Sequence, residues 1–165
     1  MWFIMLAGGL TMGIAADLHF FRKAFFSVYY HIISFLVGIM LLRAVLLISR
    51  HTGRILAQYG REGDIPRMET NRLVREGPYG YMRHPMHFGL LFFPLSIALI
   101  VGSPAFTFII APLEMIFMLL MIKFVEEPEA RKKFGKMYDD YAKDKPWFCV
   151  KIKCLKSLFK KVPPA

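Results

Sequence analysis

The residues best suited to chemistry form two polar motifs, Arg83-His84-Pro85 and Glu126-Glu127. The planar guanidinium of Arg83 is permanently charged and matches the geometry of a carboxylate. The imidazole of His84 can exchange a proton near neutral pH. The two glutamates offer acceptors for hydroxyl or ammonium groups, and their charge favours a cationic centre nearby. Residues of these types suit the recognition of a charged ligand.

Two apolar segments, residues 88–101 and 104–124, separate the motifs along the chain. The connection between them is Gly102-Ser103-Pro104, a turn too short to hold a domain. Two spans joined in this way return the chain to the side of the membrane from which it left. The pattern therefore places both motifs at one membrane face, in a site fed from water and bordered by lipid.

The motifs and their order carry a family resemblance. The first motif continues as Arg-His-Pro-Met-His-Phe-Gly over residues 83–89, and FGKMYDDY follows the glutamates at residues 134–141. Over residues 73–147 the chain resembles the isoprenylcysteine carboxyl methyltransferases and phospholipid N-methyltransferases. Their signature is Arg-His-Pro-x-Tyr-x-Gly, a helical hairpin and then Glu-Glu. His87 stands where that family usually has tyrosine, so an imidazole replaces a phenol.

The resemblance implies methyl transfer from S-adenosylmethionine to a lipophilic acceptor, either a prenylcysteine carboxylate or a phospholipid amine. A carboxylate is already nucleophilic, whereas an amine must first lose a proton to a base such as His84, His87 or a glutamate. The acceptor therefore stays open. Proximity and alignment are expected to do most of the catalysis.

The same resemblance implies a cofactor region at residues 72–89 and 126–147, with catalytic roles for Arg83, His84 and Glu127. Backbone groups around residues 80–85 are expected to be free to bond the ligand. The predicted cofactor-binding residues are Tyr79, Tyr81, Arg83, His84, Pro85, His87, Gly89, Glu126 and Glu127.

Composition predicts an all-α fold, a polytopic transmembrane helical bundle. The chain has 165 residues, of which 56% are hydrophobic, and its mean hydropathy is +0.42. These values exceed those of an ordinary soluble domain and fit a single membrane domain, residues 1–165. About 20 apolar residues span a bilayer. We expect spans near residues 2–20, 24–48, 86–101 and 104–124.

The first of these spans has an alternative interpretation as a secretory signal, although the basic start typical of such signals is missing. Gly9 and Gly13 lie four residues apart in it, the spacing of small residues that lets another helix approach closely.

The distribution of charge argues against nucleic acid as a partner despite a formal net charge of +10. Lysine and arginine gather in residues 49–83 and from Lys123 onward, as the positive-inside rule expects of cytoplasmic segments. Four spans then place the N-terminus, the cofactor site and the C-terminal helices in the cytoplasm. This topology leaves Arg22 and Lys23 on the outer face.

Two charged residues lie inside apolar stretches, where charge is costly. Arg43 near the end of the second span either snorkels to the surface or binds substrate. Glu114 either pairs with Arg43 or a tyrosine hydroxyl, or lines a path for a lipid substrate. It lies about 18 Å of helix away from Glu126, at 1.5 Å per residue.

The C-terminal segments suggest surface contacts. The run from Pro128 to Lys145 is amphipathic, with Ala130, Phe134, Met137 and Tyr141 at helical spacing, and is expected to cover the site. Residues 148–165 alternate apolar side chains with lysines, which predicts contact with anionic lipid or a partly ordered basic tail. Cys149 and Cys154 are expected to be free thiols, and no metal site is predicted.

Two other functions stay open. A membrane sterol reductase that uses NADPH would share a related helical C-terminal architecture, and such membrane enzymes need no glycine-rich dinucleotide motif. A non-catalytic membrane scaffold would use Arg-His-Pro only to cap a span. Binding of S-adenosylmethionine rather than NADPH would separate the enzymes, and binding of neither would favour the scaffold.

Overall fold

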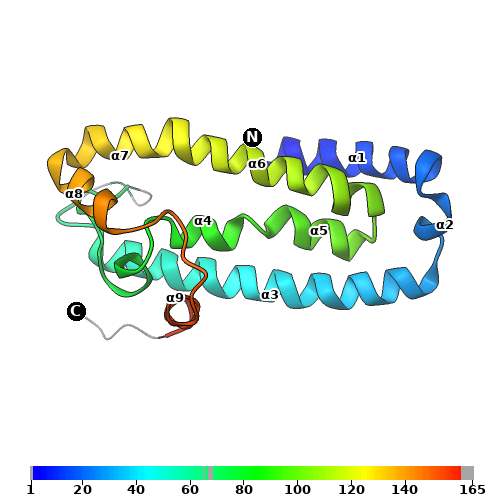
Figure 1. Cartoon of the computed structure of the whole chain (residues 1–165), viewed down its shortest axis with the longest axis horizontal. Helices are drawn as coiled ribbons and strands as arrows, with labels where there is room; N and C mark the ends of the chain where they lie inside the picture. Colours follow the sequence, from blue (N-terminus) through cyan, green and yellow to red (C-terminus); the bar gives the residue numbers. More distant parts are fainter. Residues whose placement is uncertain (1, 65, 67–68, 161–165) are drawn as a thin grey trace. The chain divides into compact units, whose positions relative to one another are not determined.

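The computed structural model describes residues 2–64, 66 and 69–160, with the side chains of residues 2 and 3 left out. Within this part of the chain the secondary structure is helical and contains no strand, as the hydropathy pattern predicts (Figure 1). The described residues fall into two compact units. The first unit comprises Met1–Val45 and Leu91–Met121, and the second comprises Leu46–Leu90 and Ile122–Ala165.

The first unit holds the helices of the predicted spans. It contains α1 (Trp2–Phe20), the short α2 (Arg22–Phe25), the beginning of α3 (Val28–Tyr59), and α5 (Phe93–Val101). The chain then turns at Gly102, whose φ of 72° suits glycine, and enters η2 (Phe106–Ile110) and α6 (Ala111–Met121). These helices run alongside one another in Figure 1.

Glycines allow segments of the first unit to approach one another closely. A Cβ on Gly13 would lie 2.9 Å from Cβ of Phe106, and one on Gly9 would lie 2.9 Å from a carboxylate oxygen of Glu114. The core around this contact consists of Ala98, Phe106 and Ala111. The prediction that Gly9 and Gly13 admit a neighbouring helix is confirmed.

Prolines explain where the predicted spans break or widen. The third span is divided into α4 (Pro85–Leu90) and α5, because in a continuous helix the ring of Pro94 would clash with the carbonyl four positions earlier and could not donate a hydrogen bond to it. The wide turns η2 and η3 (Ile122–Glu126) each contain the residue four positions before a proline, Pro112 and Pro128. A π-helical turn accommodates the missing N–H without ending the helix.

Two long helices are apolar enough to cross a membrane, Val28–Tyr59 and Phe106–Phe134, and two shorter apolar helices accompany them, Ile4–Phe20 and Pro85–Val101. Only 22% of the apolar window is buried in each of the long helices. A core helix of a soluble protein would be mostly buried, whereas lipid tolerates exposed apolar side chains. The protein is therefore a helical membrane protein.

The second unit holds both polar motifs. It is built from the end of α3, η1 (Gly77–Gly80), α4, η3, α7 (Glu127–Phe134), α8 (Lys136–Asp144) and α9 (Ile152–Ser157). The amphipathic run after Pro128 forms two helices rather than one, because Gly135 adopts a φ of 54° between α7 and α8. In α3, Ile48, Thr52 and Ile55 remain buried at helical spacing, so the helix continues eleven residues past the predicted end of its span, to Tyr59.

The C-terminal segment differs from the sequence-based prediction. Cys149 and Cys154 form a disulfide, so the expectation of free thiols is wrong. The turn that precedes α9 brings their Cα atoms to 5.8 Å, within the range that a disulfide requires. Cys154 and Leu158 pack against Ile48 and Met82, while Ile152 on the other face of α9 is exposed. The described part of the tail therefore packs against the rest of the second unit.

Candidate active site

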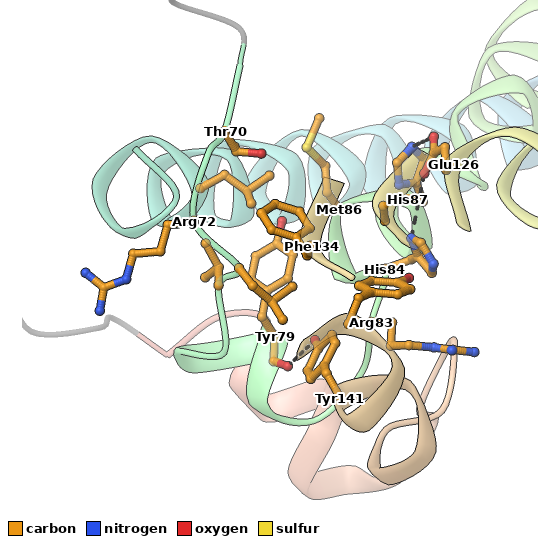
Figure 2. Close-up of a pocket in the computed structure, with 15 residues that line it drawn as sticks. Thr70, Arg72, Tyr79, Arg83, His84, Met86, His87, Glu126, Phe134 and Tyr141 are labelled. Carbon is orange, nitrogen blue, oxygen red and sulfur yellow. Dashed lines mark hydrogen bonds and ion pairs between the residues drawn. The ribbon is translucent and has the colours of Figure 1, made fainter. Parts of the chain in front are cut away.

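The second unit contains a cavity of about 220 Å³ between the two polar motifs. Tyr79 comes from η1, Arg83 and His84 from the turn before α4, and His87 from α4 itself. Glu126 ends η3. Figure 2 shows the rings of Tyr79 and Phe134 inside this cavity, with His84 and His87 on either side of Glu126. The other lining residues are Leu56, Thr70, Arg72, Leu73, Val74, Met86, Ala130, Tyr138 and Tyr141.

The two glutamates lie beside opposite nitrogens of one imidazole. Nε2 of His84 lies 2.8 Å from Oε1 of Glu127, and Nδ1 lies 3.7 Å from Oε2 of Glu126. The other oxygen of Glu126 lies 2.8 Å from Nε2 of His87. Adjacent positions in the Glu-Glu pair therefore enclose the His84 ring and join it to His87.

Glu127 is the centre of a buried polar network. Besides His84, the hydroxyl of Tyr138 donates to Oε1 at 2.8 Å, and Nη1 of Arg83 lies 3.2 Å from Oε2. Burial by itself would raise the pKa of Glu127, but the hydrogen bonds from His84 and Tyr138 and the charge of Arg83 outweigh it and lower the pKa. Glu127 is therefore held as a carboxylate.

The same network sets the protonation of its neighbours. Burial lowers the pKa of His84 despite the hydrogen bond to Glu127, so the imidazole is neutral at pH 7. Burial also raises the pKa of Tyr138, and the neighbouring Glu127 adds to this effect. Tyr138 therefore remains a neutral donor. With a carboxylate as partner, the single N–H of His84 is on Nε2.

Backbone contacts fix the turn that carries Arg83 and His84. Their N–H groups donate to the carbonyls of Pro146 and Trp147 at 3.0 and 3.2 Å. The expectation that backbone groups around residues 80–85 are free for a ligand is therefore wrong at these two positions. The carbonyls of the C-terminal segment therefore accept hydrogen bonds from both donors.

Tyrosines of α8 complete the support of the site. The hydroxyl of Tyr141 donates to the backbone carbonyls of Tyr79, at 2.5 Å, and Met82, at 3.2 Å. Its ring lies under the guanidinium of Arg75 at 5.6 Å. The sequence predicts Tyr141 on a covering helix but indicates no role for Tyr138. The downstream FGKMYDDY motif, which contains both residues, was the available signal.

The structure separates the predicted site residues into two groups. Tyr79, Arg83, His84, His87 and Glu126 line the cavity. The other four predicted residues do not line it. Glu127 contacts His84 without lining the cavity, and Tyr81 is 47% exposed. Pro85 and Gly89 are buried in α4, where a Cβ on Gly89 would lie 2.8 Å from the side chain of Ile48.

Arg43 and Glu114 belong to the first unit. Arg43 is exposed, and no ion pair joins it to Glu114 among the described residues. Glu114 is 6% exposed, and its Oε2 has no hydrogen-bond partner in the described part of the chain. The ion pair of Glu114 with Arg43 considered from the sequence is therefore not formed among the described residues.

A family model described as phospholipid methyltransferase matches residues 32–137, well over half of the chain. The chain belongs to the phospholipid methyltransferase family. The match contains both polar motifs and most of α3, so it confirms the resemblance and extends it toward the N-terminus. Membership implies a methyltransferase acting on a phospholipid or another lipophilic acceptor. Neither the curated proteins nor the solved structures contain a significant match to the chain.

Proposed function

We propose that this protein transfers a methyl group from S-adenosylmethionine to a lipophilic acceptor, either a phospholipid amine or a prenylcysteine carboxylate. The observation that carries the proposal is the meeting of Arg83 and His84 with Glu126 and Glu127 at one cavity, although long apolar helices separate the motifs in the chain. This arrangement coincides with membership of a phospholipid methyltransferase family.

Two buried hydrogen-bond donors without a partner support the binding of the cofactor in this cavity. The hydroxyl of Tyr79 and Nε of Arg83 are buried and lack a hydrogen-bond partner among the described residues. Both residues line the cavity. An unmade hydrogen bond at a buried donor is costly, so a ligand that supplies acceptors would be favoured. A carboxylate and ribose hydroxyls are such acceptors.

Glu126 complements these donors. Its side chain is 36% exposed and lines the cavity, so one carboxylate can accept from hydroxyl or ammonium groups and favour a cation. Burial raises the pKa of Tyr79, which keeps its hydroxyl protonated as a donor. We assign the principal cofactor contacts to Tyr79, Arg83 and Glu126, with Glu127 holding Arg83 and His84 in place.

The space available is consistent with an elongated ligand. The cavity of about 220 Å³ is smaller than the roughly 300 Å³ at which ligand pockets begin. A second cavity of about 320 Å³ shares Leu56, Thr70 and Met86 with the first. A ligand whose polar groups contact Tyr79, Arg83 and Glu126 in the first cavity would extend past the shared residues into the second.

The bound cofactor would supply an electrophilic methyl group for in-line displacement by the acceptor. The protein's own contribution is orientation: the Glu127 network fixes Arg83 and His84, and Tyr141 fixes the backbone of Tyr79. Buried side chains keep water from the polar groups they surround. Holding the reactants in alignment supplies much of such a rate enhancement.

We place the cofactor site at the cytoplasmic face of a multi-pass protein, with the acceptor arriving from the bilayer. The basic segments 49–83 and from Lys123 onward support this orientation. Exposed apolar side chains along α3 and α6, such as Met40 and Leu113, provide the lipid-facing surface. The exposed Val150 and Ile152 and the lysines of the tail would meet anionic lipid.

The test incubates purified protein with methyl-labelled S-adenosylmethionine and either total lipids or a prenylcysteine analogue. We expect label in a lipid fraction that grows with time and is absent from boiled protein. Label that resists mild base indicates N-methylation, and label released by mild base indicates a methyl ester. No transfer to either acceptor class by folded, cofactor-binding protein would overturn the proposal.

A further inference from the structure

Three potential metal ligands converge beside the cavity. One ring nitrogen of His84, one ring nitrogen of His87 and a carboxylate oxygen of Glu126 all lie within 4.8 Å of one another. His84 immediately precedes α4 and His87 lies in its first turn, so their rings are neighbours, with centroids 5.8 Å apart. Glu126 approaches from η3. Figure 2 shows the carboxylate between the two imidazoles.

The two nitrogens of His84 have different surroundings. Nε2 lies 2.8 Å from Oε1 of Glu127, a hydrogen-bond distance. Nδ1 lies 3.7 Å from Oε2 of Glu126, too far for a direct hydrogen bond. A cation between Nδ1 and this carboxylate would bind both.

The residues around His84 resemble the hydrogen-bonding groups that hold the ligands of a metal site in place. A metal-bound histidine commonly donates its other N–H to a carboxylate, which fixes the ring and its tautomer. Glu127 has this relation to His84 and is itself held by Tyr138 and Arg83. The side chain of His84 is only 10% exposed, so the ring cannot turn freely into solvent.

We propose that His84 Nδ1, His87 Nε2 and Glu126 bind a divalent transition-metal ion of the zinc class. Two imidazoles with one carboxylate suit Zn²⁺, whereas Mg²⁺ and Ca²⁺ prefer oxygen ligands. Three protein ligands leave a position for a fourth, the pattern of zinc sites that meet a substrate or water. All three residues line the cavity, which gives that position access to a ligand.

The sequence alone predicted no metal site because the third ligand lies far along the chain. The site also depends on His87, which stands where the family usually has tyrosine. A phenol is a poor substitute for imidazole at zinc, so the ion would distinguish this chain from relatives with the usual residue. The proposal goes beyond methyl transfer and does not depend on it.

The test uses full-length protein purified in detergent without a polyhistidine tag, stripped with a chelator and dialysed against Zn²⁺. Bound zinc is counted by mass spectrometry, and its affinity is measured by competition with a chelating dye, without S-adenosylmethionine. We expect one zinc ion per chain, not displaced by excess Mg²⁺. His87→Tyr should weaken binding by at least about tenfold, a loss typical even of residues that only support a ligand.

His19→Gln is the matched control, because His19 is exposed in α1 of the first unit and should contribute nothing. X-ray absorption of the zinc-loaded protein keeps the proposal falsifiable if a variant misfolds, since it needs only the wild type. We expect nitrogen and oxygen ligands at about 2.0 to 2.2 Å. Absence of zinc from the wild type, equal affinity in folded His87→Tyr, or sulfur ligation would overturn the proposal. A protein that binds zinc but transfers no methyl group would contradict only the proposed function.

Discussion

Two glutamates, Glu114 in the first unit and Glu127 in the second, are equally buried at 6% exposure, yet their surroundings differ. Glu127 has three partners, His84, Tyr138 and Arg83, whereas Oε2 of Glu114 has none among the described residues. A buried charge needs partners to be kept ionised. Polar partners therefore stabilise the charge of Glu127, and Oε2 of Glu114 has no comparable stabilisation.

The first unit is closely packed around two glycines. Gly9 and Gly13 let α1 approach side chains of η2 and α6 closely, and the core beside them is apolar. In membranes such contacts replace the hydrophobic effect as the cause of helix association. Both units also join distant segments through side-chain hydrogen bonds. In the first unit the carboxylate of Asp17 accepts from the hydroxyl of Ser103 and the N–H of Ala105, and in the second the hydroxyl of Tyr141 donates to the carbonyls of Tyr79 and Met82. Only the bonds of the second unit support a residue that lines the candidate site, Tyr79.

The largest expected effect comes from exchanging the two carboxylates for amides. Glu127→Gln leaves the Arg83 charge buried without its partner, which should lower the free energy of unfolding by about 3 to 5 kcal/mol. Glu114→Gln removes a carboxylate oxygen that has no partner and should leave stability unchanged or higher. Thermal unfolding in detergent compares the two variants. Equal losses in both would show that the partners of Glu127 do not stabilise its charge as described.

The next effect separates the two faces of the tail. Leu158 is 1% exposed against Ile48 and Met82, so Leu158→Ala should destabilise the second unit by about 2 to 5 kcal/mol. Ile152 is 71% exposed, and Ile152→Ala should leave stability unchanged while weakening binding to anionic vesicles. Unfolding and vesicle sedimentation are measured on the same samples. A stable Leu158→Ala protein would show that the tail is not docked.

Glycine substitutions examine the packing of the first unit. A Cβ at Gly13 would meet Phe106 and Ser103 at 2.9 and 3.0 Å, so Gly13→Ala should cost about 1 to 3 kcal/mol. Gly8 has no atom within 4 Å of its Cβ position, and Gly8→Ala should be neutral or stabilising because alanine favours helix. The difference between their unfolding temperatures is the readout. Equal unfolding temperatures of the two variants would contradict close packing at Gly13.

The smallest expected effect concerns Tyr79 and Tyr81, which the sequence predicted to have the same role in cofactor binding. Tyr79→Phe removes an orphaned donor inside the cavity and should weaken S-adenosylhomocysteine up to about tenfold, the value of one hydrogen bond. Tyr81 is 47% exposed and lies outside this cavity, so Tyr81→Phe should change affinity little. Calorimetry on both variants decides the matter. A larger loss in Tyr81→Phe would place the ligand elsewhere.

The sequence predicted the elements that depend on composition and spacing. Hydropathy identified the helical segments, and the small-residue spacing identified the contact of Gly9 and Gly13. The convergence of Arg83 and His84 with the two glutamates followed from a hairpin whose turn is too short for a domain. Each of these conclusions rests on a local pattern with one structural solution, and the structure agrees with them.

Other features depend on contacts between segments and were missed. The backbone N–H groups of Arg83 and His84 donate to the carbonyls of Pro146 and Trp147. No local sequence pattern predicts these hydrogen bonds. Likewise the roles of Glu126 and Glu127 differ because adjacent residues in a helix point in different directions, one into the cavity and one toward Tyr138. Spacing along the chain identifies such a pair but does not say which member faces the ligand.

The central claim, that the cavity of the second unit binds S-adenosylmethionine, is tested most directly by calorimetry of the full-length protein in detergent. S-adenosylhomocysteine serves as a stable ligand, and NADPH is titrated under the same conditions. We predict one binding site for S-adenosylhomocysteine, weakened by Tyr79→Phe, and no heat from NADPH. Binding of NADPH without binding of S-adenosylhomocysteine would contradict the account and favour a reductase.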